Sequence, residues 1–169
     1  MAKKENNTTA PEQEAQSSLI VNTQYIKDLS FENPSAPMQP LENEGSPDIS
    51  IHIEAQAKPV VDRSFEVSLR IQVDAKRQEK KVFLLELEYA GVFTVGKDVP
   101  DEYLRPILMI ECPRILFPFA RHVVSKITQE AGYPALLLTP VDFAELYQRQ
   151  ISQEQHAQQE KEQTTGMIQ

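Results

Sequence analysis

The hydrophobic pattern of this chain changes period near its middle. In the first half, apolar and polar residues alternate. The alternation has no fault over residues 65–75, and the same pattern recurs less strictly over residues 49–55, 82–95 and 25–32. Strict alternation is typical of β-strands with one buried and one wet face. The short connections between the three later segments favour antiparallel neighbours. The first half therefore predicts four antiparallel strands, with Ala90-Gly91 marking a bend or bulge in the last one.

In the second half the apolar residues recur at helical spacing. Residues 104–121 form the most apolar stretch of the chain, and three prolines there exclude one smooth helix. A helix is predicted from Pro113 to Gln129, with an outward position at Val124, and a last helix from Phe143 to about Ile151. The loop between them contains three consecutive leucines at 136–138, which cannot all point inward.

Strands followed by helices predict an α+β fold rather than an alternating α/β one. The expected architecture is a four-stranded antiparallel sheet with helices packed on one face. Residues 1–18 and 152–169 are polar and low in complexity, so we expect a disordered N-terminal tail and a C-terminal tail that is partly helical and then disordered. The folded domain is expected to span residues 19–151.

Charge and composition limit the classes of partner that the protein can bind and the compartment in which it is expected. The formal net charge is -8 with a sequence pI near 4.9, which argues against nucleic acid and anionic membranes and favours a basic partner. A single cysteine, Cys112, fits a reducing compartment. The first residues lack the apolar run of a signal peptide, and no apolar run is long enough to cross a membrane, so a soluble, cytoplasmic protein is expected.

Catalytic machinery is not visible in the sequence. The histidines, His52, His122 and His156, are scattered without ligand spacing, and Cys112 precedes a proline in the most apolar stretch, which suggests an inert buried thiol. The five glycines are isolated, so no phosphate-binding loop is present. We therefore expect a binding protein without catalytic residues, metal site or cofactor.

The predicted wet face of the sheet is rich in acids. Every strand contributes at least one, and Arg70 is the one clear counter-charge in the pattern. A plain solvated surface would also be polar. An apolar residue among these acids, Leu84 beside Glu86, instead indicates a docking surface for a basic, partly apolar partner.

Four blocks of residues carry a resemblance to a known family. They are Y-I-K-D-L-S-F-E-N-P-S-A-P at 25–37, F-L-L-E-L with A-G-V-F at 83–93, C-P-R-I-L-F-P-F-A-R at 112–121, and L-T-P-V-D-F at 138–143. Together and in this order they resemble the SecB protein-export chaperones. The resemblance implies a SecB-like fold and a cytoplasmic, bacterial, ATP-independent holdase that assembles as a homotetramer, a dimer of dimers. Such proteins bind unfolded preproteins and deliver them to SecA, the motor of the Sec translocase.

The resemblance also implies two sets of site residues. In the family SecA is held by an acidic patch on the outer sheet face, and the matching positions here are Asp28, Glu32, Leu84 and Glu86. Any zinc would belong to SecA. The client-binding groove maps, more loosely, onto Ile49, Ile51, Ile53, Leu137, Phe143, Leu146 and Tyr147. The crossover segment departs from the family, because it offers only Met38 and Leu41 where an aromatic residue is common.

Two other functions fit parts of the pattern. A SecB-like chaperone dedicated to one partner, such as the antitoxin of a toxin system, would share the fold, although the acidic face with Leu84 favours the SecA-coupled version. A small hydrolase or isomerase would need a cluster of polar groups within the core pattern, and none appears in the sequence.

Overall fold

The computed structural model of the chain describes residues 18–37 and 45–166. The expected N-terminal tail therefore lies almost entirely outside the described residues, as do Met38 and Leu41 of the crossover segment. The strands are β1 (Leu19–Glu32), β2 (Asp48–Val61), β3 (Ser64–Arg77) and β4 (Lys80–Val95). The helical elements are η2 (Asp101–Tyr103), α1 (Leu104–Pro106), η3 (Ile107–Glu111), α2 (Cys112–Glu130) and α3 (Phe143–Gly166).

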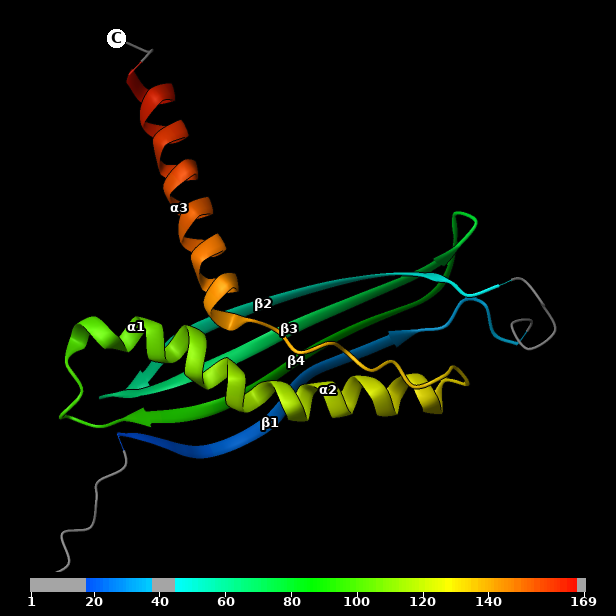
Figure 1. The fold of residues 1–169 in the computed structure, drawn as a ribbon, viewed down its shortest axis with the longest axis horizontal. Coiled ribbons are helices and arrows are strands. Elements are labelled where there is room, and N and C mark those ends of the chain that lie inside the picture. The colour runs from blue at the N-terminus through cyan, green and yellow to red at the C-terminus, as the bar shows by residue number, and fades with distance from the viewer. Residues whose placement is uncertain (1–17, 38–44, 167–169) are drawn as a thin grey trace, which may run out of the picture.

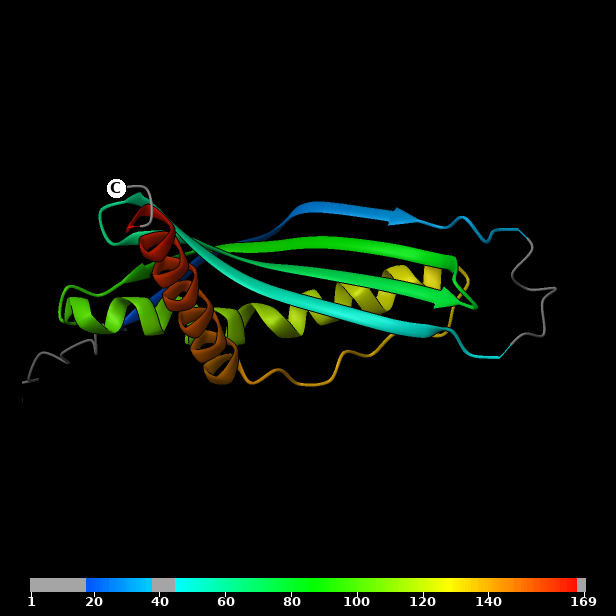
Figure 2. The same cartoon turned by 90° about the horizontal axis from the view of Figure 1, so that it is seen from above.

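The four strands form one antiparallel sheet in the order β1-β4-β3-β2, and they lie side by side in this order in Figure 2. The predicted alternation of buried and exposed residues is confirmed along β3, whereas Ile49 and Ile51 of β2 are 41% and 45% exposed. Along β3 the inward residues Val67, Leu69, Ile71 and Val73 are fully buried. Full burial of each such side chain stabilises the fold by about 1.5–3 kcal/mol.

The sheet has no register shift of β4 at Ala90-Gly91, where one was predicted; its shifts lie in β1, between Pro59 and Val61 of β2, and between Ala75 and Lys76 of β3. The register of β1 shifts between Val21 and Thr23 and again between Ile26 and Asp28, whereas β4 runs straight through Gly91. A Cβ added to Gly91 would lie 2.9 Å from the Thr23 carbonyl oxygen and 3.0 Å from Cδ2 of Leu116. Glycine is therefore required here by the close approach of the Thr23 carbonyl of β1 and of the Leu116 side chain of α2.

A bent helical rod runs from α1 through α2 along one face of the sheet (Figure 1). The prediction that prolines interrupt residues 104–121 is confirmed, because η3 is a π-helical turn in which the Cys112 N–H bonds to the Ile107 carbonyl. Pro113 has no N–H for the usual α-helical bond, and the turn before it is widened.

Helix α2 packs its buried side against β3 and β4, with Leu116, Ala120 and Val124 fully buried. The prediction that Val124 points outward was wrong. The helical phase places Val124 one turn after Ala120 on the core side, while His122 is exposed.

Two polar contacts fix the loop between α2 and α3. The buried Thr128 hydroxyl accepts the Leu136 N–H at 3.0 Å, and the Tyr133 hydroxyl donates to Oδ1 of Asn33 at 2.6 Å. In this loop Leu138 is buried and Leu137 is 63% exposed, so the prediction that the three leucines cannot all point inward is confirmed.

Helix α3 extends away from the sheet (Figure 1). Only its first turns join the body, through the buried side chains of Phe143 and Tyr147. The Asp142 side chain accepts the Ala144 and Glu145 N–H groups and so caps the helix. The helix continues to Gly166, beyond the expected domain limit at residue 151, and that limit remains a prediction.

Candidate functional site

The outer face of the sheet brings the predicted acidic residues together. The register places Asp28 opposite Glu88, Ser30 opposite Glu86, and Glu32 opposite Leu84. Asp28, Glu32 and Glu86 are exposed and Leu84 is half-buried. All four residues expected to bind SecA therefore share one face on two neighbouring strands, and we call them the acidic face.

A second group of acids on this face is already paired. The Tyr25 hydroxyl donates to Glu66 at 2.6 Å, and the Lys27 ammonium also donates to Glu66. Lys27 lies 3.6 Å from Glu88, which Arg70 approaches at 3.4 Å from the other side. Among the described residues, by contrast, Asp28, Glu32 and Glu86 make no ion pair, so their charge is free for a partner.

The expectation that Arg70 is the one clear counter-charge was therefore wrong. Lys27 sits where the β1 register shifts, between Ile26 and Asp28, so its side chain reaches the acids of β3 and β4. Strict alternation would have turned Lys27 to the opposite face from Asp28.

The ionisation of this network follows its hydrogen bonds. The bond from Lys27, and then that from Tyr25, lowers the pKa of the Glu66 carboxyl below its usual range. The same carboxylate raises the pKa of Lys27 and of Tyr25, chiefly through those hydrogen bonds. At neutral pH Glu66 is therefore ionised and paired with the protonated Lys27, so its charge is largely neutralised within the protein.

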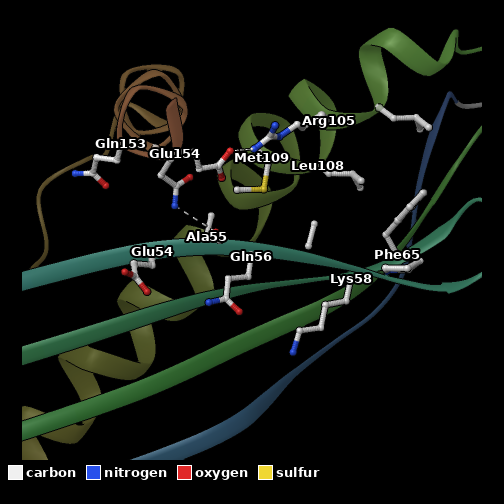
Figure 3. A pocket seen from close by; sticks show the side chains of 14 residues that line it. Glu54, Ala55, Gln56, Lys58, Phe65, Arg105, Leu108, Met109, Gln153 and Glu154 are labelled. Carbon is white, nitrogen blue, oxygen red and sulfur yellow. Dashed lines mark hydrogen bonds and ion pairs between the residues drawn. The ribbon is translucent and has the colours of Figure 1, made fainter. Parts of the chain in front are cut away.

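A second surface lies along the edge strand β2, where two hollows adjoin. The first, about 660 Å³, is closed by α1, η3 and α3 (Figure 3). The second, about 440 Å³, lies between β2, the loop after α2 and α3. Both hollows are lined by Glu54, Gln150 and Gln153, so they adjoin as one trough with these three residues as the shared wall. We call it the β2 trough.

The predicted groove residues occupy three different environments. Ile51, Ile53 and Leu146 line the second hollow, and Ile49 and Leu137 are exposed apolar residues that do not line either hollow. Phe143 and Tyr147 are 1% and 8% exposed, so they support the base of α3 from within the core.

Sequence reasoning missed several residues of the first hollow, namely Phe65, Leu104, Arg105, Leu108 and Met109. The apolar residues among them were assigned to the core. Helical and strand periodicity predicts which side chains are buried, but it does not show which of them border a cavity. The helical rod places Leu108 and Met109 beside β2, where the edge of the sheet is open.

Catalytic groups do not gather at either surface. Cys112 is fully buried, and burial raises the pKa of its thiol to about 12, as expected for an inert thiol. His52 is exposed beside Glu54 at 3.1 Å. Among the side chains that the structure describes, those of residues 18–37 and 45–155, no group of three or more His, Cys, Asp or Glu could hold a metal ion. In the same part of the chain, no helix is both long and apolar enough to cross a membrane.

A sheet with an open acidic face and a trough along its edge strand defines a protein-binding module. Three comparisons with known proteins specify it further. The family model "Preprotein translocase subunit SecB" matches residues 12–154. Protein-export protein SecB of Paramagnetospirillum magneticum is 49% identical over 142 residues, covering 83% of this chain and 90% of the relative. The SecB protein of Rhodospirillum centenum is 44% identical over 147 residues, covering 87% and 88%.

This chain belongs to the SecB family of protein-export chaperones. The resemblance seen in the sequence is thereby confirmed. A solved structure supports the fold alone: a SecB-like chaperone of Mycobacterium tuberculosis, in complex with an antitoxin peptide, matches with a TM-score of 0.56 at 19% identity, covering 73% of this chain and 91% of that one.

Proposed function

We propose that this chain is a cytoplasmic, ATP-independent holdase that binds unfolded precursors of exported proteins in the β2 trough and delivers them to SecA through the acidic face. It has no catalytic activity and needs no cofactor in this role. The observation that carries client binding is the trough itself, in which apolar side chains lie beside an open strand edge.

The trough suits a client without a defined sequence. Its walls combine apolar side chains, such as Ile51, Leu146 and Met109, with flexible polar ones, both amide and charged, so no fixed set of side-chain hydrogen bonds is required of the client. Folded proteins bury their apolar segments and offer no extended backbone. The surface therefore selects for unfolded chains.

The acidic face supports the SecA-coupled role over dedication to a single antitoxin-like partner. Glu32 and Glu86 lie beside Leu84, Asp28 lies further along the same face, and none of the three has an ion-pair partner among the described residues. Free carboxylates around an apolar anchor complement a basic, partly apolar segment, which is the chemistry proposed for SecA.

A homotetramer, built as a dimer of dimers, is part of the proposal. Exposed apolar residues that one subunit leaves uncovered support it: Val21 and Ile26 on β1, and Phe119 on α2 are 40–50% exposed. Several troughs on one assembly would bind one long client with increased avidity.

The test is mass by light scattering, with and without a chemically unfolded client and then with SecA. We expect a tetramer that gains the mass of the client and then a complex with SecA. A monomer that ignores the client would refute the proposal, and client capture without SecA binding would favour the dedicated chaperone.

A further inference from the structure

Strand β2 is an edge strand with an accessible backbone. This 14-residue strand pairs, among the described strands, only with β3. In an antiparallel pair every second residue turns its N–H and C=O away from the partner strand. The Ala55 carbonyl is one of these outward groups, because a residue outside the sheet binds it. By the same alternation, the backbone groups of Ile53 and Ala57 also face the trough.

The residue that binds the Ala55 carbonyl is Gln150 of α3. Its Nε2 donates to the Ala55 carbonyl oxygen at 3.4 Å, the dashed line that ends at Ala55 in Figure 3. The bond is longer than a normal N–H···O bond of about 2.9–3.0 Å. Meanwhile Oε1 of Gln150 is buried and has no hydrogen-bond partner among the described residues. The carboxamide is therefore held in place by one weak bond while its other polar atom is unsatisfied.

The position of Gln150 decides the shape of the trough. The two hollows on either side of it share Glu54, Gln150 and Gln153 as lining residues. Gln150 is the contact that crosses from α3 to the strand edge between them. With its side chain turned away, the hollows would join along residues 51–59 of β2.

We propose that the Gln150 carboxamide is a removable stopper that occupies the place of a client backbone. An extended client segment pairs with the edge of β2, takes over the Ala55 carbonyl, and displaces the Gln150 side chain. This inference rests on the proposed holdase function, and it assigns the client's main chain, rather than its side chains, as the group recognised at this point.

Energetics favour the exchange. A client strand offers several ladder bonds where Gln150 offers one long one, and it satisfies the outward groups of Ile53 and Ala57 as well. The displaced carboxamide turns toward solvent, which relieves the unpaired Oε1. In the absence of a client, the stopper shields an edge that would otherwise template pairing with other chains.

The rest of α3 need not move. Its base is anchored by buried Phe143 and Tyr147, and Arg105 donates to Glu154 at 2.6 Å while lying 5.9 Å from the centre of the Tyr147 ring. The exchange is thus a side-chain rotation on a fixed helix, and it can be tested by changing that side chain alone.

The first experiment measures the dissociation constant of the full-length protein for a chemically unfolded client. Gln150→Ala removes the stopper, and Gln150→Met keeps its length but cannot bond to Ala55. We expect both variants to bind about two- to fivefold more tightly, which is the value of one weak hydrogen bond that no longer has to be broken. Gln148→Ala, an exposed glutamine of the same helix, is the matched control and should equal the wild type.

If both Gln150 variants bind the client with unchanged or lower affinity, the proposal that Gln150 is a stopper is refuted. It leaves the holdase function standing as long as the wild type still captures the client. If the wild type itself captures no client, the proposed function fails first.

The second experiment is amide hydrogen exchange of the wild type with and without the client. The outward N–H groups of Ile53, Ala55 and Ala57 should gain protection on client binding, whereas those of the buried strand β3 should not change. Capture of the client without new protection at these three amides would overturn backbone pairing even if the affinities behaved as expected.

Discussion

The acidic face and the β2 trough lie on the same sheet but recognise partners by different physics. On the outer sheet face, the free carboxylates of the acidic face lie beside the internally paired Glu66 and Glu88, so recognition depends on where charge remains uncompensated. In the β2 trough apolar and amide side chains lie among charged ones such as Glu54, Arg105 and Arg149, and a strand edge supplies main-chain groups. One surface is suited to a single oriented partner, and the other to many chains of any sequence.

The largest effect is expected from a change that removes both surfaces together. Val124→Asp places a carboxylate in the fully buried contact between α2 and the sheet. The cost of about 4 kcal/mol or more is a large share of a domain's stability, so the subunit should unfold. Circular dichroism and denaturant titration measure this, with the exposed His122→Asp as the control that should stay folded. A folded Val124→Asp protein would contradict the burial of Val124.

Glu86→Lys should separate the two surfaces. It reverses one of the free charges of the acidic face, and we expect SecA binding to weaken by about tenfold to a hundredfold while client capture is unchanged. Calorimetry or interferometry at two salt concentrations checks this, since the wild-type affinity should also fall as salt rises. Glu102→Lys in η2 makes the same charge change away from the face. If both variants lose SecA affinity equally, the effect of Glu86→Lys comes from the change in net charge and not from the acidic face.

Ile51→Asp should produce the opposite separation. Ile51 is 45% exposed and lines the second hollow, so an aspartate there loses apolar contact with the client, about 1 kcal/mol or a fivefold loss of affinity. SecA binding should persist. Val61→Asp, on an exposed residue at the end of β2, is the control. Client affinity that is insensitive to Ile51→Asp would move the client site out of the trough.

The smallest effect concerns the internal pairing on the outer face. Lys27→Met removes the cation that holds Glu66, and we expect a loss of at most about 1 kcal/mol in the free energy of unfolding at pH 7, because the pair is partly exposed to solvent. The folded-state pKa of Glu66 is lowered, so its contribution is present above its unfolded pKa and lost as pH falls through the folded value.

The difference between wild type and Lys27→Met should therefore shrink below about pH 4. Urea titrations at pH 7 and at low pH measure it, with Lys97→Met as an exposed control. A difference that is constant across this range would show that Lys27 acts through packing and not through its charge.

Much of the fold could be predicted because its signals are local. The alternation along residues 65–75 already defines the buried face of β3, and the prolines at 106, 113 and 118 already exclude a regular helix. The acidic face was also predictable, since Asp28, Glu32, Leu84 and Glu86 keep strict alternation with the buried residues beside them. The failures occurred where two elements meet: a Cβ at Gly91 would crowd both β1 and α2, and Val124 lies on the side of α2 that packs against the sheet.

The sequence by itself determined which residues face inward and outward along β3, because period and polarity are properties of neighbouring residues. Only the tertiary structure decided which charges remain free, because the β1 bulge brings Lys27 to Glu66 and Glu88 across two strands. It also decided where the trough lies, since a helix from the end of the chain places Gln150 against Ala55, 95 residues earlier. Such contacts depend on distances in space that no local pattern records.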